Sequence, residues 1–273
     1  MKILKTTSDL KRLLQKEQNG SIGFVPTMGA LHEGHASLLR VARNQTSTVV
    51  LSILVNPTQF GDQSDLDNYP QTLAEDLELA EREGVDFVFA PKAADLYGGT
   101  PSANKIDWGS ITSDFEAAFR PGHFDGVVAV VDRLFKAVAP DIAFFGEKDL
   151  QQVAVVRKLT ADNHPQVKIV SCDVIRDEKG LALSSRNIRL SDRGKVDALE
   201  LSKALKRIKD NVNKKEQIAL ETSNLNANLN VELEYLAGVN EVSYSKKDSP
   251  NTWTHVIIAA EVEGVRLIDN IRL

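Results

Sequence analysis

The chain has 273 residues, and its 33 Lys and Arg against 38 Asp and Glu give a formal net charge of −5 at pH 7. This length suits one large domain or two modest ones, while the acidic balance argues against a nucleic-acid-binding protein, which usually has a strongly basic face. No stretch approaches the roughly 18 apolar residues of a membrane span, residues 1–5 lack a signal-peptide core, and the single Cys172 allows no intrachain disulfide, so we expect a cytoplasmic protein with no nucleic-acid or membrane partner.

Short apolar runs alternate with amphipathic stretches over the first 174 residues. Strands are expected at residues 21–26, 48–55, 85–90, 141–145 and 167–172, and helices at residues 35–45, 70–84, 126–139 and 149–163. Near-continuous apolar strands separated by helices are typical of a parallel sheet covered on both faces. The pattern therefore predicts a Rossmann-like α/β domain over residues 1–174.

The pattern changes after about residue 175. Helices are expected at 191–213 and 215–228, the first with Ser191 as its N-cap, and strands follow at 231–237, 253–261 and 265–269. A tight turn at 263–264 joins the last two strands. These features predict a smaller α+β domain with an antiparallel sheet over residues 175–273, packed close to the first domain because no low-complexity linker separates them.

The segment 26–35 reads PTMGALHEGH and follows the apolar run 22–25, where a strand passes into a helix. A helix N-terminus attracts phosphate through its free N–H groups and its dipole. Gly34 lets a flat ligand approach the backbone, and His32 and His35 lie side by side if the turn is helical. A surface turn and half of a metal site are the alternatives, but no third ligand is near in sequence, so the context favours nucleotide chemistry.

Four polar segments lie at or near the carboxyl ends of the predicted strands, where parallel sheets bind ligands. They are residues 27–35, 56–61, 146–152 and 183–187. Each alone is more typical of a surface or capping turn, but their shared position points to one site. A further loop, 120–124, carries Arg120 and His123; no role follows from first principles, and positioning a mobile wall of the site is the one suggestion for it.

The side chains of these segments suit a polyphosphate and a small acid. Lys148 offers a point charge to phosphate, and Ser184, Ser185 and Arg186 offer hydroxyl and guanidinium donors. Gln59 and Gln152 can bond hydroxyls or a carboxylate without adding charge. The sequence lacks the G-x-x-x-x-G-K-[ST] and G-x-G-x-x-G phosphate motifs and the G-x-S-x-G elbow, which disfavours kinase, dehydrogenase and hydrolase activities.

The sequence resembles the pantothenate synthetase (pantoate–β-alanine ligase) family, nearly from end to end. The resemblance is carried by the segments PTMGALHEGH, VNPTQFG, RPGHFDGV, FFGEKDLQQ, LALSSRN and RLIDNI. The His-x-Gly-His element alone would indicate only the wider nucleotidylyltransferase superfamily. The family resemblance implies condensation of pantoate with β-alanine at the expense of ATP, through pantoyl adenylate, with release of AMP and pyrophosphate.

The resemblance also implies roles for individual residues. His35 is the expected proton donor at the reacting phosphate, and His32 and Lys148 are expected to support the same charge. ATP contacts are expected from Met28, Gly29, Ala30, Leu31, His32, Glu33, Gly34, His35, Gly146, Glu147, Lys148, Asp149, Ile175, Leu183, Ser184, Ser185 and Arg186. Pantoate contacts are expected from Gln59 and Gln152, with Met28 and Phe60 on its methyl groups. Mg²⁺ should accompany ATP, with no clear protein ligand beyond Asp76 as a weak candidate, and a homodimer is implied.

Three positions depart from the family pattern: Gln71 replaces an expected arginine, Asp125 stands at an often basic or polar position, and Leu183 replaces a methionine. Two other functions stay open. One is a nucleotidylyltransferase that acts on a phosphorylated alcohol, which Gln59 and Gln152 disfavour because a phosphate would favour cations there. The other is a nucleotide sensor without turnover, which the presence of all the proposed charge-stabilising residues disfavours. A tRNA synthetase lacks support because no anticodon-reading domain is evident.

Overall fold

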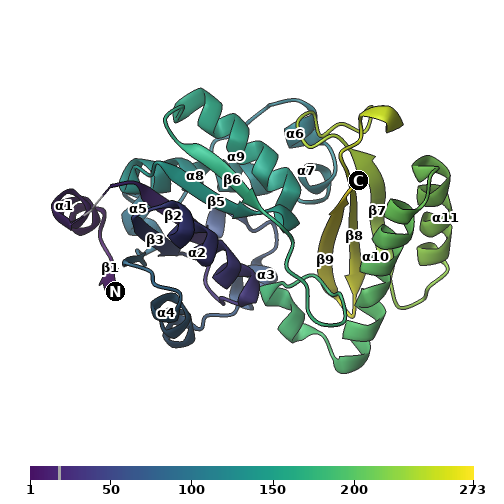
Figure 1. The fold of residues 1–273 in the computed structure, drawn as a ribbon, viewed down its shortest axis with the longest axis horizontal. Coiled ribbons are helices and arrows are strands. Elements are labelled where there is room, and N and C mark those ends of the chain that lie inside the picture. The colour runs from purple at the N-terminus through teal and green to yellow at the C-terminus, as the bar shows by residue number, and fades with distance from the viewer. Residues whose placement is uncertain (18–19) are drawn as a thin grey trace.

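The computed structural model describes residues 1–17 and 20–273, and Figure 1 shows an α/β layer followed by a smaller sheet with its own helices. In the described residues the first sheet has six parallel strands in the order β1-β4-β3-β2-β5-β6. They are β1 (Lys2–Leu4), β2 (Ile22–Thr27), β3 (Thr48–Ile53), β4 (Phe87–Phe89), β5 (Ile142–Gly146) and β6 (Lys168–Cys172). The predicted parallel sheet is confirmed, with β1 as an addition that was too short to produce a pattern.

Helices cover both faces of this sheet, as predicted. The helices of the α/β layer are α1 (Thr7–Glu17), α2 (Glu33–Gln45), α3 (Gln63–Asp67), α4 (Leu73–Arg82), α5 (Ala93–Tyr97), α6 (Ser110–Ser113), α7 (Glu116–Phe119), α8 (His123–Val138) and α9 (Leu150–Asn163). One apolar cluster packs α1, α8 and α9 against the sheet, and another packs α2 and α4. Because α2 follows β2 and α9 follows β5, the connections leave these neighbouring strands toward opposite faces.

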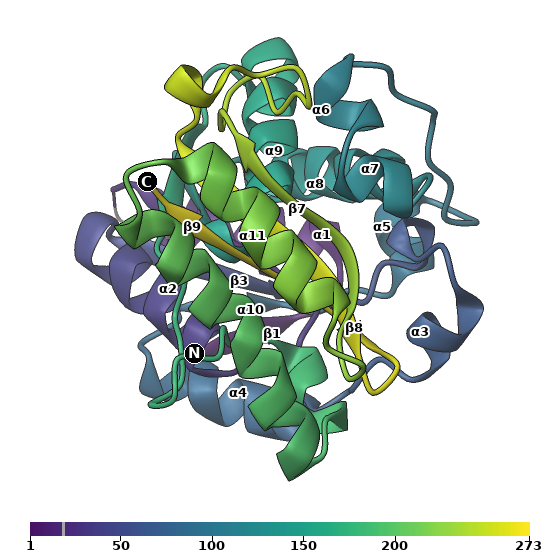
Figure 2. The same cartoon turned by 90° about the vertical axis from the view of Figure 1, so that its right-hand side faces the viewer.

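The second sheet is antiparallel, in the order β7-β8-β9, as the sequence predicts. Its strands are β7 (Glu232–Val239), β8 (His255–Val262) and β9 (Val265–Arg272), preceded by α10 (Asp192–Asp210) and α11 (Lys214–Asn226). Figure 2 shows α10 and α11 lying across one face of this sheet, where they enclose a separate apolar core. Ser191 caps α10 as expected, accepting a hydrogen bond from Gly194 N at 3.0 Å.

Several boundaries differ from the sequence predictions for local reasons. The expected helix at 70–84 begins only at Leu73, because its first backbone hydrogen bond runs from Asp76 N to Thr72 O. Helix α2 begins at Glu33, two residues early, since His32 acts as its N-cap. Helix α8 begins at His123, so the 120–124 loop, which was predicted as a separate segment, partly belongs to it. The short helices α3, α5, α6 and α7 and the 11-residue α1 were not predicted.

The two sheets meet through a small apolar cluster and through polar contacts. Phe115 and Leu150 of the first layer pack with Tyr244 and Ile257 of the second. The division at residue 174 stays a prediction. None of the helices formed by residues 1–17 and 20–273 combines the length and the apolar character that a membrane crossing requires.

Four short 3₁₀ segments also occur in the described residues, and three of them overlap the polar segments that the sequence places near strand ends. They are η1 (Pro57–Gln59), η2 (Glu147–Asp149), η3 (Ser185–Arg189) and η4 (Pro250–Thr252). Helix α8 packs on η1 at Gly126, where an added Cβ would stand 2.3 Å from Thr58 O and 2.5 Å from Gln59 Cα. The backbone of η1 thus packs directly on the backbone of α8.

We predict that Gly126→Ala lowers the thermal unfolding midpoint and weakens substrate binding by displacing η1. Helix propensity alone favours alanine over glycine by about 1 kcal/mol, whereas overpacking costs about 1–3 kcal/mol. Because no flexible side chain can yield to the new methyl group, the clash should win. Calorimetry would measure the midpoint. An unchanged or higher midpoint would show that the close packing of α8 on η1 does not require glycine at position 126.

Candidate active site

A pocket opens at the carboxyl ends of β2 and β5, and its wall takes residues from all four predicted segments. The predicted site residues that line it are Met28, His32, Gly34, His35, Gln59, Gly146, Lys148, Asp149, Gln152, Ile175, Leu183, Ser184, Ser185 and Arg186. The parallel pairing of β2 with β5, with Gly23 opposite Ile142, explains why the first and third segments meet. Residues that are far apart in the sequence therefore face one cavity.

His32 and His35 form the start of α2 together. His35 Nδ1 accepts a hydrogen bond from His32 N at 3.2 Å, and His32 Nδ1 accepts one from Gly34 N at 3.1 Å. This reciprocal arrangement is a capping box built from two imidazoles. The ring centroids lie 4.2 Å apart, so the predicted side-by-side placement is confirmed. Since each Nδ1 accepts, each neutral ring carries its proton on Nε2 and presents an N–H donor.

The turn before α2 is held in an unusual conformation by Asp76. Gly29 and Ala30 have positive φ values of 85° and 49°. The Asp76 carboxylate, in a residue that is 2% exposed, accepts hydrogen bonds from Ala30 N at 3.1 Å and Leu31 N at 2.7 Å. Asp76, the weak metal candidate, thus anchors the loop and does not line the pocket.

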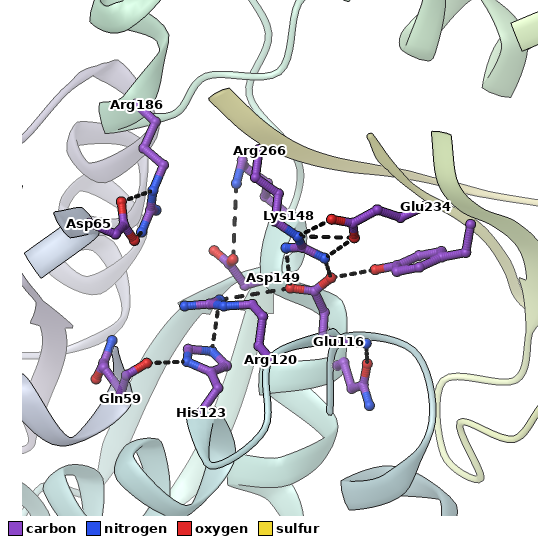
Figure 3. Close-up of polar contacts among 12 residues, drawn as sticks. Gln59, Asp65, Glu116, Arg120, His123, Lys148, Asp149, Arg186, Glu234 and Arg266 are labelled. Atoms are coloured by element: carbon purple, nitrogen blue, oxygen red, sulfur yellow. Dashed lines mark hydrogen bonds and ion pairs between the residues drawn. The ribbon is translucent and has the colours of Figure 1, made fainter. Parts of the chain in front are cut away.

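Three cations line the pocket, and each is placed by other contacts. Lys148 follows β5, and its Nζ lies 3.9 Å from an Asp149 carboxylate oxygen. Arg120 Nη1 donates to His123 Nε2 at 3.2 Å, and His123 Nδ1 donates in turn to Gln59 O at 2.9 Å. Arg186 reaches the wall from η3 (Figure 3). The cationic lining suits an anionic ligand.

The histidines of the pocket are neutral at physiological pH. Burial, with the positive charge of Lys148, lowers the pKa of His32 to about 4. Burial, then the neighbouring His32 and Lys148, lowers the pKa of His35 to about 3. Burial and Arg120 lower the pKa of His123 to about 4. A bound anion would oppose the electrostatic part of these shifts.

The predicted pantoate residues line the same pocket as the histidines. The Gln59 carboxamide oxygen accepts from Asn56 Nδ2 at 3.0 Å, which fixes the orientation of its Nε2 next to Met28 Sδ at 3.1 Å. Asn56 is held by donating to Gly126 O at 3.0 Å. Gln152, Met28 and Phe60 also line the pocket. This part of the wall offers amide groups beside apolar surface.

Five predicted ATP-contact residues do not line the pocket: Gly29, Ala30, Leu31, Glu33 and Glu147. The Glu33 carboxylate pairs with Arg40 at 2.7 Å on the surface. The buried Glu147 carboxylate accepts from Ser171 Oγ at 3.0 Å and from Arg272 at 2.7 Å, so it ties η2 to β6 and β9. In this structure the carboxylates of Glu33 and Glu147 therefore contact protein side chains outside the pocket.

Sequence reasoning missed several lining residues. Tyr69, Arg120, His123 and Asp173 line the cavity, and so does Asn56, which lies within the predicted segment 56–61 but had no assigned role. For the 120–124 loop the sequence offered only a place as a wall of the site, and its adjacency to η1 depends on the packing of α8. The presence of an arginine and a histidine in one loop was the only sequence feature that pointed to the site. Its meaning became clear only from the tertiary structure.

Next to this pocket, a network of charged side chains joins the α/β part of the chain to the second sheet. Arg266 of β9 donates to Glu116 of α7 at 2.8 Å and to Glu234 of β7 at 2.7 Å, and Tyr235 Oη donates to Glu116 Oε1 at 2.6 Å (Figure 3). Glu116 lies 3.8 Å from Arg120. The second sheet is thus fixed relative to the Arg120 wall.

No group of three or more His, Cys, Asp and Glu side chains in residues 1–17 and 20–273 is arranged to hold a metal ion. Asp149 is the carboxylate in the pocket lining next to Lys148, and its side chain is half exposed. Mg²⁺ commonly binds one or two carboxylates together with substrate phosphates. The donor set therefore fits an ion that a polyphosphate brings with it, with Asp149, next to Lys148, and Asp173 as the carboxylates of the pocket lining.

The chain is similar to known proteins along nearly its whole length. The model of the pantoate–β-alanine ligase family matches residues 2–272. The chain is 42% identical over 265 residues to the pantothenate synthetase of Cytophaga hutchinsonii, covering 94% of this chain and 93% of that protein.

Solved structures agree with the sequence comparison. The pantothenate synthetase of Thermus thermophilus superposes with a TM-score of 0.91 at 38% identity, covering 100% of this chain and 99% of that one. The pantoate–β-alanine ligase of Francisella tularensis, described as complexed with β,γ-ATP and β-alanine, gives a TM-score of 0.82 at 31% identity, covering 100% of this chain and 97% of that chain. Together with the family match over nearly every residue, these similarities show that the chain belongs to the pantoate–β-alanine ligase family.

Proposed function

We propose that this protein joins pantoate to β-alanine with ATP, through a pantoyl-adenylate intermediate, and releases AMP and pyrophosphate. The observation that carries the proposal is the meeting of His32 and His35 with Lys148 across the β2–β5 pair, beside Gln59 and Gln152. Cations and N–H donors suit a triphosphate, and neutral amides suit a small hydroxy acid. Family membership supports the same reaction.

The first step activates the pantoate carboxylate, because an unmodified carboxylate oxygen is a poor leaving group for the later acyl transfer. The pantoate carboxylate attacks the α-phosphorus of ATP, the P–O bond to pyrophosphate breaks, and a mixed anhydride, pantoyl adenylate, forms. His35 and His32 donate Nε2–H hydrogen bonds to phosphate oxygens as negative charge builds, and Lys148 adds a full positive charge. This chain's contribution is alignment and electrostatic stabilisation, which require no covalent enzyme intermediate.

The second step transfers the acyl group. The β-alanine amine attacks the acyl carbon, the amide bond forms, and AMP leaves with the carboxylate oxygen that it received. Gln59 and Gln152 hold pantoate through its hydroxyl and carboxylate groups, while Met28 and Phe60 contact its two methyl groups. The same placement of pantoate serves both steps.

Further properties belong to this proposal. Mg²⁺ would enter with ATP, held by phosphate oxygens and Asp149, and would supply charge neutralisation at the triphosphate. Residues 175–273 would act as a lid that brings Leu183, Ser184, Ser185 and Arg186 over the phosphates. Ser185 Oγ already donates to Ala30 O at 3.0 Å, which supports such a placement. A homodimer follows from the family resemblance, and sedimentation would test it. A cytoplasmic location follows from the single cysteine.

Exchange of labelled pyrophosphate into ATP separates this function from its rivals. We expect exchange to require pantoate and to proceed without β-alanine, because the adenylate forms before the amine is used. Exchange that depends on a phosphorylated alcohol instead would assign the chain to another transfer reaction. ATP binding without exchange under any acceptor would identify a nucleotide sensor.

We predict that His35→Gln lowers the exchange rate at least about a hundredfold, the usual cost of removing a donor from a charge-stabilising site. Glutamine is chosen because its carboxamide oxygen can still accept from His32 N, as glutamine does in ordinary capping boxes. The thermal midpoint should therefore change little. A His35→Gln protein that retains near-normal exchange would remove His35 from the mechanism.

The lowered histidine pKa values predict acid sensitivity. A histidine with a pKa near 3 or 4 in the folded state and about 6.5 unfolded favours the folded state above pH 6.5. This stability is lost as the pH falls toward the folded-state pKa, by at most about 1.4 kcal/mol per pH unit for each group. Urea unfolding between pH 7 and 4 should show this loss, and His35→Gln should reduce its slope. An unchanged slope in that variant would contradict the low pKa of His35.

A further inference from the structure

Asp65 joins two segments that are far apart in the sequence. It belongs to α3, in the stretch that follows η1, and its carboxylate accepts from Arg186 Nη2, 121 positions away, at 2.7 Å and from Arg186 Nε at 3.3 Å (Figure 3). The same carboxylate accepts from Arg189 Nη1 at 3.3 Å. Both arginines belong to η3, so one carboxylate of the first layer holds the segment that enters the second.

Arg186 lines the pocket and Asp65 does not. Both side chains are partly buried, at 24% and 26% exposure. Asp65 therefore contacts the guanidinium from outside the cavity wall. It is placed to act on a ligand only through Arg186.

The contact leaves Arg186 able to bind a second anion. A guanidinium has five N–H donors in one plane, and Asp65 takes the Nε–Nη2 edge as a two-point contact that fixes this plane. The Nη1 group has no part in the Asp65 contact. The ring of Tyr69, a residue only 8% exposed, lies 5.7 Å from Arg186 Cζ and packs edge-on against Phe60. Two neighbours thus hold the guanidinium in place.

Both partners of this pair are ionised at neutral pH. Burial raises the pKa of Asp65, but its hydrogen bond to Arg186 has the larger combined effect with the nearby arginines, and the net pKa is lowered. Burial lowers the pKa of Arg186, and Asp65 more than restores it. A partly buried arginine that keeps its charge is ready to meet phosphate without a change of protonation.

We propose that Asp65 is a positioning residue that orients Arg186 to receive the polyphosphate of ATP, with Arg189 holding Asp65 in place. This inference rests on the proposed function for the identity of the anion. An arginine side chain is rich in rotamers, and fixing it before the ligand arrives removes an ordering cost from binding. The carboxylate supplies that order through folded-state contacts alone.

Asp65 could instead compete with ATP for Arg186, and that role predicts the opposite change in ATP affinity. If Asp65 were chiefly a competitor for the guanidinium, its removal would free Arg186 and tighten ATP binding. The positioning role requires weaker binding when the carboxylate is lost. The sign of the change in ATP affinity therefore decides between the two roles.

The test compares Asp65→Asn with Asp67→Asn. Asp67 is a carboxylate of the same helix, exposed, and bonded to Gln63 Nε2 at 2.7 Å rather than to an arginine. We expect calorimetry with ATP alone to show about tenfold weaker binding for Asp65→Asn, the order of one lost charge-assisted contact. KM for pantoate in the exchange assay should stay unchanged. Asp67→Asn should match the unmodified protein in both measurements.

A double-substitution cycle tests whether Asp65 acts through Arg186. Lysine lacks the planar fork, so Asp65→Asn should add little further loss in an Arg186→Lys background. Tighter ATP binding, no difference from Asp67→Asn, or a full additional loss in that background would overturn the inference. If the unmodified protein binds ATP but shows no pantoate-dependent exchange, the proposed reaction fails, while the ATP titrations still test Asp65.

Discussion

The parallel pairing of β2 with β5 is the constraint on which the site depends. It brings the loop after β2, with His32 and His35, beside the loop after β5, with Lys148. The connections from these two strands turn to opposite faces, so nothing fills the space above the pair, as in other open parallel sheets where the strand order reverses. The start of α2 and a lysine therefore line one pocket, where both can contact the same phosphate chain.

The loop after β2 reaches its shape through contacts that sequence proximity does not supply. Positive φ at Ala30 is unfavourable for a residue with a Cβ, and Asp76, 46 positions away, stabilises it by accepting two backbone N–H groups. The histidines in turn satisfy N–H groups at the start of α2. The same side chains thus build the helix start and fix their own Nε2–H tautomers, which links local folding to the chemistry.

Sequence patterns were sufficient where a residue's role depends on its own strand or helix. The apolar runs located β2, β3, β5 and β6, and the strand ends located the four polar segments. They carry no information where a contact depends on a distant partner. The carboxylate of Glu147, next to Lys148 in the sequence, accepts from Arg272 of the second sheet. No specific role for Arg120 followed from its loop, and the packing of α8 on η1 places it in the pocket wall.

Burial, together with the charges of the pocket, explains why its histidines are neutral. Lys148 lies close enough to lower the pKa of both His32 and His35, and Arg120 does the same to His123. An imidazolium beside these cations would add repulsion and would be partly desolvated, so the neutral ring is favoured until an anion enters. A triphosphate would oppose the electrostatic part of these shifts, since its negative charge favours protons on nearby imidazoles. Burial, which is the larger cause of the low pKa values, would remain.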